Sequence, residues 1–174
     1  IGAAMLGAGQ VFLGDYLALH VSGGTTDLLS VRVRDNVIDR IETLGSCSDI
    51  TAGQFIDRIG VALGHAFPAG EAISALAARG QAQPLRCTVR ELSASFSGAE
   101  SAVHRALEQG MSPEDAAATV LTCVAGVLDT LISRGRRQTG IDRVLLFGGV
   151  MRSEFVRRFL QARHRNLIFS EVKY

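Results

Sequence analysis

The segment from Leu17 to Gly45 reads LALHVSGGTTDLLSVRVRDNVIDRIETLG and places a polar corner between two apolar runs. A two-residue hairpin turn needs only a pair such as Asn-Gly or Asp-Gly. Here the corner from Ser22 to Asp27 carries two glycines, three hydroxyls and a carboxylate. This is more hydrogen-bonding capacity than a turn requires, so the corner is a candidate ligand contact as well as a chain reversal.

Three strands are expected around this corner. Asp15–Val21 is an apolar run typical of a buried strand, and Thr26–Val33 becomes polar toward its end. Asn36–Thr43 alternates with a period of two, which also indicates a strand. Short connections join all three, so the sequence predicts an antiparallel meander.

Beyond the meander the periodicity becomes helical. Helices are expected over 51–67, 71–80, 97–110, 112–140 and 151–164, with strands at 87–92, 142–150 and 166–172. Ser97 and Ser112 are the expected N-caps of two of these helices, and Pro113 suits a first helical position. Strands followed by alternating helices and strands indicate an α/β lobe with a mixed sheet.

A second glycine corner, Gly148-Gly149, follows the apolar run VLLF, just as Gly23-Gly24 follows the first strand. Glycine lets a ligand approach the backbone at the carboxyl end of a strand, where exposed N–H groups can hold a phosphate. Either corner alone is explained equally well as a tight turn. The two together, in this strand order, favour a nucleotide-binding fold.

Composition sets further limits. The 174 residues are 47% apolar and 20% charged with a net charge of +1, so we expect one domain with a normal core and no strong nucleic-acid binding from charge alone. Three cysteines without a C-x-x-C pair suit reduced thiols and a cytoplasmic protein. No signal peptide and no membrane span are expected, although the chain does not begin with Met.

Four blocks carry a resemblance to a known family: HVSGGTTDLL, DITAGQFIDRIGVALGHAFPAGEAISALA, ASFSGAESAV and VLLFGGVMRSEFVRRFL. In this order they resemble the TsaD-type tRNA threonylcarbamoyladenosine transferases, formerly labelled O-sialoglycoprotein endopeptidases. The resemblance implies an actin-like ATPase (ribonuclease H-like) fold and transfer of threonylcarbamoyl from an adenylate to a tRNA adenosine. It also implies ATP or adenylate as ligand and one divalent metal ion, iron or zinc.

The resemblance also implies site residues. Nucleotide contacts fall on the first corner, ribose contact on Asp57, a further contact on Gly70, and the adenine side on the second corner, with Ser153 where the family has an asparagine. The full set of implied nucleotide contacts is His20, Val21, Ser22, Gly23, Gly24, Asp57, Gly70, Gly148, Gly149 and Ser153. Asp57 could instead be a solvated side chain, or pair with Arg58 or Arg40.

The metal ligands of the family lie mostly outside this chain. Its H-x-x-x-H motif would precede Ile1 and its aspartate would follow Tyr174, which leaves His20 as the one candidate ligand; an ordinary strand-end histidine is the alternative. We therefore expect residues 1–174 to be a single lobe, the C-terminal part of a longer two-lobe protein.

Departures from the family pattern keep a second function open. Gln54 replaces a glutamate, Ala69 a glycine, Glu100 a lysine and Ser153 an asparagine. A diverged, non-catalytic paralogue could serve as a scaffold for a true family member through the long helix at 113–134. A homodimer is a further possible assembly. A metallopeptidase is the third reading, although the sequence has no H-E-x-x-H motif.

The remaining polar residues receive ordinary interpretations. Cys47 is expected in a loop without a base beside it. His65, His104 and His164 are expected at the surface without a paired carboxylate. A small basic group after the long helix is either a solvated helix end or a tRNA phosphate contact; its members are Arg134, Arg136 and Arg137.

Overall fold

The computed structural model describes residues 1–7, 12–35 and 37–170. Its centre is a five-stranded sheet in the order β3-β2-β1-β6-β7. The first three strands form the antiparallel meander that the sequence predicts, and the last two extend the sheet from β1 in parallel. Their bounds are β1 (Gly14–Val21), β2 (Thr26–Arg34), β3 (Val37–Ser46), β6 (Val144–Phe147) and β7 (Leu167–Phe169).

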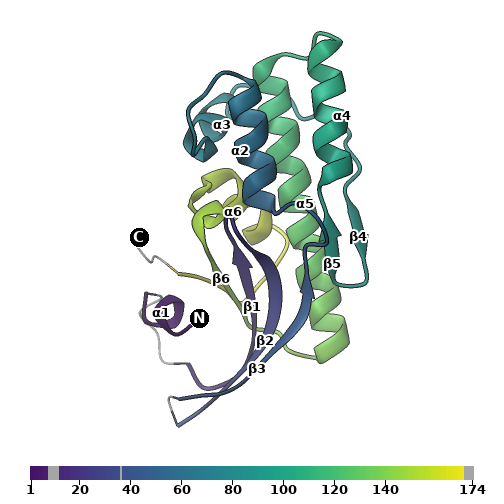
Figure 1. Ribbon diagram of the computed structural model, residues 1–174. Helices are drawn as coiled ribbons and strands as arrows, with labels where there is room; N and C mark the ends of the chain where they lie inside the picture. The colour runs from purple at the N-terminus through teal and green to yellow at the C-terminus, as the bar shows by residue number, and fades with distance from the viewer. Residues whose placement is uncertain (8–11, 36, 171–174) are drawn as a thin grey trace.

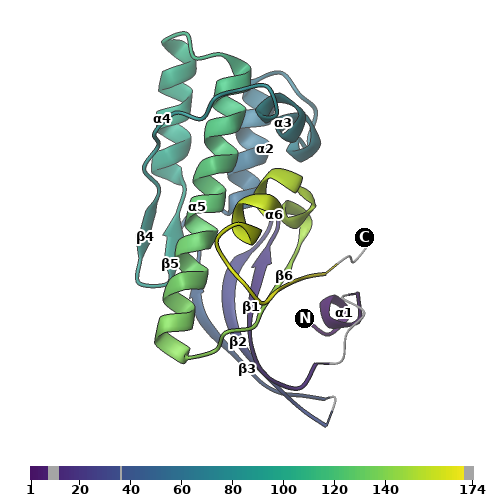
Figure 2. The same cartoon turned by 180° about the vertical axis from the view of Figure 1, so that it is seen from behind.

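Most helices gather on one side of the sheet, as Figures 1 and 2 show from opposite directions. The long helix α5 covers a sheet face with its C-terminal half, and its N-terminal half packs with α2, α3 and α4 beyond the strand ends. Helix α6 packs beside β6. The bounds are α1 (Gly2–Gly7), α2 (Ala52–Ala62), α3 (Gly70–Ala77), α4 (Ser97–Glu108), α5 (Pro113–Thr139) and α6 (Glu154–Gln161).

Two apolar clusters lie on the two faces of the sheet because side chains alternate along each strand. The larger cluster joins Leu17, Leu19 and Val21 of β1 to the helices. The smaller cluster contains Tyr16 and Ala18, and it includes Met5 of α1 on the opposite face. Strand β6 is buried at all four positions, as expected for a strand covered on both faces.

Helix α5 begins and ends as its sequence predicts. The Ser112 side chain accepts a hydrogen bond from the Asp115 N–H, and Pro113 occupies the first turn. Gly140 ends the helix with a left-handed backbone, φ +72°. By length and composition α5 could cross a membrane, but 72% of its most apolar window is buried within the protein, which is typical of a core helix.

Several expected boundaries are wrong. The strand expected at 87–92 is a small hairpin of β4 (Thr88–Arg90) and β5 (Ser93–Ser95). Helix α2 ends at Ala62, and a short 3₁₀ turn over Gly149–Arg152 precedes α6. Part of the last expected strand, 171–172, lies outside the described residues.

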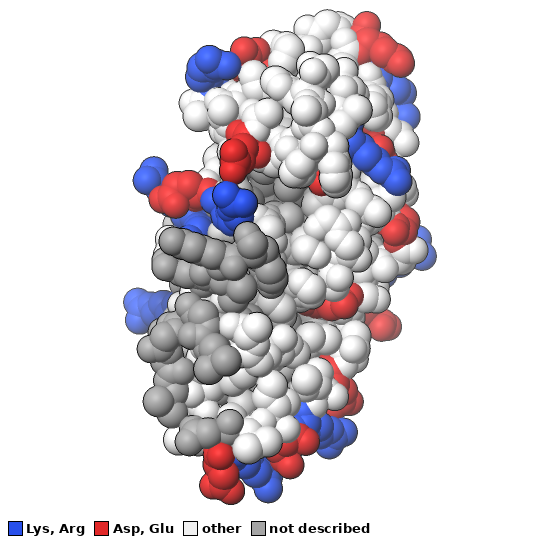
Figure 3. All heavy atoms as spheres, turned by 60° about the vertical axis from the view of Figure 1, so that its left-hand side comes forward, with Lys and Arg blue, Asp and Glu red and all other residues white. Residues whose placement is uncertain are grey.

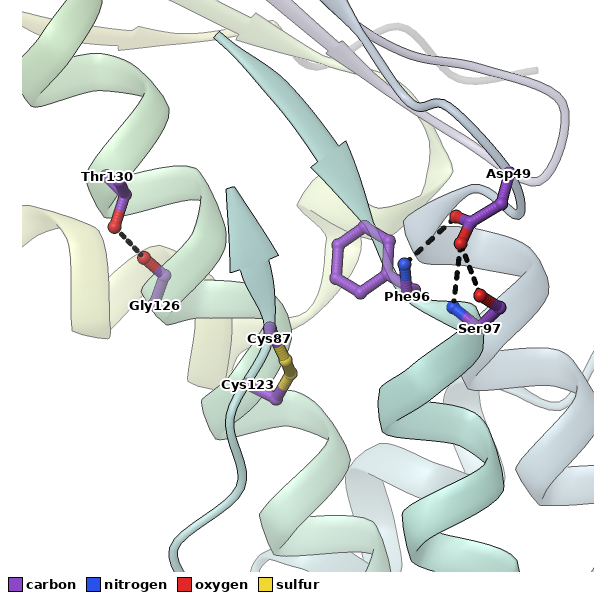
Figure 4. Close-up of a disulfide and its surroundings, with 7 residues drawn as sticks. All are labelled: Asp49, Cys87, Phe96, Ser97, Cys123, Gly126 and Thr130. Atoms are coloured by element: carbon purple, nitrogen blue, oxygen red, sulfur yellow. Dashed lines mark hydrogen bonds between the residues drawn. A yellow bond between two sulfur atoms is a disulfide. The ribbon is translucent and has the colours of Figure 1, made fainter. Parts of the chain in front are cut away.

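Ser97 is not the N-cap of α4. It is the first helical residue, and the N-cap Phe96 has no capping side chain of its own. The missing cap comes from Asp49, whose carboxylate accepts hydrogen bonds from the Phe96 N–H at 3.0 Å and the Ser97 N–H at 3.1 Å. Figure 4 shows Asp49 reaching both residues from the loop before α2. A cap supplied from 47 positions away cannot be found by a local pattern.

The cysteines also depart from expectation. Cys87 and Cys123 form a disulfide across 36 residues, so the prediction of three reduced thiols is wrong (Figure 4). The bond ties the segment before β4 to the middle of α5. Cys47 is the free cysteine, and burial, the largest effect on it, raises the pKa of its thiol to about 11. The Cys47 thiol is therefore a poor nucleophile, as the sequence predicts.

His164 is a buried, paired residue, which corrects the expectation of a surface histidine. Its Nε2 lies 2.7 Å from an Asp129 carboxylate oxygen, and its Nδ1 lies 3.3 Å from the Arg136 guanidinium. The side chain is only 6% exposed. His104 also has a carboxylate neighbour, Glu100, at 3.9 Å. The His164 contacts join the C-terminal ends of α5 and α6.

Candidate functional site

The two glycine corners leave neighbouring strands at the same edge of the sheet. Strands β1 and β6 are parallel, and His20 of β1 is opposite Phe147 of β6 in their register. Each corner follows within a few residues. Carboxyl ends of adjacent parallel strands are where α/β folds bind ligands.

The hydroxyls of the first corner organise the protein itself. The Ser22 hydroxyl accepts hydrogen bonds from the Gly24 and Thr25 N–H groups, at 3.3 and 3.1 Å. The Thr51 hydroxyl donates to the Gly23 carbonyl at 2.9 Å, and the Thr26 hydroxyl accepts from the Ala52 N–H at 3.0 Å. The corner is thus fastened to the N-terminus of α2 before any ligand binds.

Close backbone packing explains two glycines here. At Gly53 in α2 a Cβ atom would collide with the Ser22–Gly23 backbone, so only glycine lets α2 approach the corner. Gly148 has φ +106°, and a Cβ there would overlap the Val21 carbonyl oxygen. Both glycines are required by the protein's own structure.

Beside the corners lies a cavity of about 870 Å³. Five residues that the resemblance implies as nucleotide contacts line it, from four separate segments: Gly23, Asp57, Gly70, Gly149 and Ser153. The other five implied contacts do not line it; His20, Val21, Ser22, Gly24 and Gly148 support its edge from β1 and the corners. The rest of the lining is Gly53, Ile56, Phe67, Pro68, Glu71, Ser74, Leu121, Val150, Arg152 and Glu154.

Asp57 is held between the first corner and α3. One carboxylate oxygen accepts a hydrogen bond from the Ala69 N–H at 2.8 Å, just before α3. The other lies 4.0 Å from where a Cβ of Gly23 would be. Among the described residues, Arg58 pairs with Glu100 and Arg40 with Glu42, so the alternative that Asp57 pairs with one of these arginines is wrong. A fixed carboxylate at a cavity wall can accept hydrogen bonds from ligand hydroxyls.

Two cavity glycines have no structural requirement. A Cβ at Gly70 or Gly149 would meet no atom within 4 Å, and neither residue has a left-handed backbone. This separates them from Gly148 and Gly53, which the protein's own packing demands. Glycine at these two positions keeps space open in the cavity, as a site does when a ligand must approach the backbone.

The cavity wall is acidic at one part and apolar at another. Three carboxylates line it, from Asp57, Glu71 and Glu154, against one guanidinium, Arg152, which pairs with Glu71 at 3.0 Å. The apolar part is formed by Ile56, Phe67, Pro68, Leu121 and Val150. The Phe67 side chain is 75% exposed, which is rare for a large aromatic residue. Sequence reasoning did not single out Phe67.

Among the described residues, His20 has no partners with which to complete a metal site, and its role as a ligand stays a prediction. Its ring stacks on Phe147, with centroids 4.6 Å apart, and burial, the largest effect, lowers its pKa, so the imidazole is neutral. The described residues contain no group of three His, Cys, Asp or Glu side chains that could hold a metal ion. One imidazole does not make a metal site, so the described donors do not by themselves fit the ion that the resemblance implies.

Two of the departures from the family pattern have structural roles away from the cavity. Gln54 completes a capping box with Thr51, accepting from its N–H at 3.1 Å. Glu100 pairs with Arg58 at 3.3 Å, which neutralises its charge. Ser153 lines the cavity and its hydroxyl lies 3.4 Å from that of Ser74.

A second cavity, of about 520 Å³, lies beside the disulfide. Its wall includes Cys87, Cys123 and three threonines of α5, namely Thr119, Thr122 and Thr130. The described residues that line it include no aspartate, glutamate or histidine. It therefore lacks the acid–base groups and the strand-end corners of the first cavity.

Comparison with known proteins identifies relatives along most of the chain. The family model described as TsaD: tRNA N6-adenosine threonylcarbamoyltransferase matches residues 3–174. A tRNA N6-adenosine threonylcarbamoyltransferase of Bacillus licheniformis is 36% identical over 155 residues, which cover 83% of this chain and 44% of that protein. The protein of the same name from Methanopyrus kandleri is 34% identical, covering 77% and 37%. The chain thus spans less than half the length of these curated relatives.

Solved structures show the same fold at low sequence identity. Full-length HypF, in a phosphate- and nucleotide-bound form, has a TM-score of 0.78 at 11% identity, covering 97% of this chain and 39% of HypF. The activator of 2-hydroxyisocaproyl-CoA dehydratase from Clostridium difficile, with bound ADPNP, has a TM-score of 0.64 at 16% identity, covering 98% and 59%. The prediction of an actin-like ATPase fold with a mixed sheet is confirmed.

Proposed function

The chain belongs to the TsaD family of tRNA N6-adenosine threonylcarbamoyltransferases, and from that premise we propose that it is the nucleotide-binding lobe of such a transferase. The observation that carries the proposal is the cavity shared by both glycine corners, Asp57 and Gly70. The ligand is ATP or threonylcarbamoyl-adenylate, and the acceptor is an adenosine of tRNA. Because the chain spans less than half of its relatives, a second lobe completes the cleft in the full-length protein.

The acidic part of the cavity suits a ribose. The two ribose hydroxyls are donors, and the fixed carboxylate of Asp57 is an acceptor whose orientation is already set by the Ala69 N–H. Gly70 and Gly149 leave room for the ligand to lie against the backbone. Three carboxylates against one arginine fit a nucleoside better than a bare polyphosphate, since like charges repel.

The apolar part of the cavity suits the purine base. Phe67 and Pro68 border it at the start of α3, and Ile56, Leu121 and Val150 complete it. An exposed aromatic ring can stack on a base, which stabilises the complex by about 1–3 kcal/mol. We assign this stacking role to Phe67.

The chemistry assigned to this lobe is positioning. In the reaction, the N6 amine of adenosine attacks the carbamoyl carbon of the adenylate, the bond from that carbon to the phosphate oxygen breaks, and AMP leaves with that oxygen while the amine loses a proton. The residues of this chain bind the adenylate and orient its reacting carbon. No step is assigned to a metal ion held by this chain, because its described donors do not form a metal site.

The two alternative functions, a scaffold paralogue and a metallopeptidase, gain no support from the site. The departures at Gln54 and Glu100 that motivated a scaffold paralogue are explained by a helix cap and an ion pair outside the cavity. Nothing in the described residues supports peptidase chemistry. Binding of ATP is therefore the property to test first.

Calorimetric titration of the full-length protein with ATP tests the proposal. We expect one saturable site, and Gly149→Ala should weaken it about tenfold, because a methyl group in a filled site costs about 1–3 kcal/mol. The variant should fold normally, since a Cβ at Gly149 meets no atom within 4 Å.

Gly98→Ala is the matched control. Gly98 also has open space around its Cβ position, but it lies in α4 away from the cavity. ATP affinity should be unchanged in this variant. No ATP binding by the unsubstituted protein, or equal affinity in all three proteins, would count against the proposed site.

A further inference from the structure

The net charge of the chain is near zero, but its basic and acidic residues are unevenly distributed along the sequence. Residues 131–170 hold nine of the eighteen basic side chains, all arginine, but only two of the seventeen acidic ones. The rest of the chain is correspondingly acidic. Clustering of basic residues in one part of a domain is the electrostatic footprint of a nucleic-acid partner.

Some of these arginines hold the protein together. Arg136 donates to the carbonyls of Asp142 and Arg165, Arg143 to the Tyr16 hydroxyl and the Leu13 carbonyl, and Arg134 to the Val89 and Glu91 carbonyls. Their guanidinium groups are committed to internal contacts. They explain part of the cluster without any ligand.

The arginines of α6 and of the turn after it are different. Arg158, Arg163 and Arg165 are exposed, and Arg157 is half-buried. Among the described residues the one carboxylate paired with them is Glu154, at 2.8 Å from Arg158. We call Arg157, Arg158, Arg163 and Arg165 the α6 arginine face; Figure 2 shows α6 at the front of the molecule.

Aromatic rings hold two members of the α6 arginine face in place. The Arg157 guanidinium lies 4.7 Å from the Phe169 ring centroid, and that of Arg163 lies 3.7 Å from the Phe159 ring centroid. Stacking fixes the direction of a long side chain and leaves its remaining N–H groups free for phosphate, although one N–H group of Arg163 donates to the Phe159 carbonyl at 3.1 Å. Figure 3 shows another side of the molecule, where acidic and basic groups lie close together around a largely uncharged middle.

This face is continuous with the proposed nucleotide cavity. Ser153 and Glu154, where α6 begins, line that cavity; Arg157 and Arg158 follow on the same helix, and Arg163 and Arg165 lie in the turn after it. We propose that the α6 arginine face binds the phosphate backbone of the tRNA whose adenosine reacts with the adenylate held in the cavity. This inference rests on the proposed function, because that function supplies the tRNA.

Binding of an unmodified tRNA transcript to the full-length protein, measured at several salt concentrations, tests the inference. The triple variant Arg157→Gln/Arg158→Gln/Arg163→Gln should bind at least about tenfold more weakly at ~0.1 M salt. The plot of log K against log salt should become less steep, its negative slope shrinking in magnitude by about 2–3, since each lost phosphate contact removes about 0.7–0.9.

The matched control is Arg34→Gln/Arg40→Gln/Arg90→Gln, which removes the same charge from exposed positions on β2, β3 and β4. It should leave tRNA affinity within about twofold and the salt slope nearly unchanged. Thermal melting and ATP titration of both variants should match the unsubstituted protein. Equal losses in the two triple variants, or no tRNA binding by a protein that binds ATP, overturns the inference. Absence of ATP binding with the expected tRNA pattern overturns the proposed function alone.

Discussion

At the scale of single residues, the glycines separate structure from ligand binding. Gly53 and Gly148 are required by backbone packing, whereas Gly70 and Gly149 face open space in the cavity. The motif pattern predicts the same role, a nucleotide contact, for Gly70, Gly148 and Gly149. The three-dimensional structure is needed to distinguish these glycines, because the difference lies in which atoms a Cβ added at each position would meet.

Asp49 is the residue that sequence reasoning missed most clearly. Burial acts to raise its pKa, but hydrogen bonds from the Ser95 and Ser97 hydroxyls and the Phe96 and Ser97 N–H groups outweigh burial and hold the pKa well below its usual range. A carboxyl whose folded-state pKa is lowered stabilises the fold above its unfolded pKa of about 3.9. That stabilisation is lost as pH falls from there toward the folded-state pKa.

The first prediction at this scale concerns acid stability. Asp49→Asn should lower the free energy of unfolding at pH 7 by about 1 kcal/mol, a modest figure because the side chain is partly exposed to solvent. The difference should shrink as pH falls below about 4, since Asp49 then binds a proton in the unfolded chain while it stays ionised in the folded protein. Urea unfolding between pH 7 and pH 2.5 measures it.

Asp35→Asn is the control for this experiment. Asp35 is exposed in the turn after β2 and has a left-handed backbone, φ +49°, which asparagine adopts readily. Its stability profile should follow that of the unsubstituted protein at every pH. A constant difference between Asp49→Asn and the unsubstituted protein down to pH 2.5 would show that the Asp49 charge has no part in the cap.

At the scale of helices and strands, patterns within a few residues correctly predicted the features that depend on nearby residues. The meander, the Ser112 cap of α5 and the Gly140 stop follow from patterns within a few residues. The disulfide and the Asp49 cap depend on contacts between residues 36 and 47 positions apart. Contacts between such distant residues depend on the tertiary fold, and no periodic pattern in the sequence predicts them.

The segment from Gln81 to Arg90 shows how such contacts work together. The Gln81 N–H donates to Asp115 at 2.8 Å, and the Gln83 N–H donates to the Thr119 hydroxyl at 2.9 Å. The Cys87–Cys123 bond follows, and Arg134 then holds the Val89 carbonyl at 3.1 Å. An irregular segment is thereby fastened along the length of α5.

We predict that the disulfide stabilises this arrangement measurably. Closing a loop of this length restricts the unfolded chain and is worth about 2–4 kcal/mol. The variant Cys87→Ser/Cys123→Ser should unfold at lower urea than the unsubstituted protein under oxidising conditions. With a dithiol reductant present, the two proteins should unfold at nearly the same urea concentration. Equal stability under both conditions, or no change in free thiols on reduction, would contradict the bond.

At the scale of the whole molecule, helix α6 connects the proposed nucleotide cavity with the α6 arginine face. The carboxyl ends of β1 and β6 carry the two glycine corners, the cavity lies between these corners and helices α2, α3 and α6, and α6 continues from the cavity into the arginine face. The family and the fold were predictable because motif blocks and strand order lie in the sequence. The shape of the cavity, the role of Phe67 and the continuity with α6 required the three-dimensional arrangement.

Hydrogen exchange of the full-length protein, with and without a non-hydrolysable ATP analogue, tests the shared cavity most directly. Binding should slow exchange in peptides that cover 67–71 and 148–154, which line the cavity from two sides. Peptides covering 83–89, beside the second cavity, should be unchanged. Slowed exchange at 83–89 alone, or at only one of the segments 67–71 and 148–154, would contradict a single nucleotide cavity lined by both.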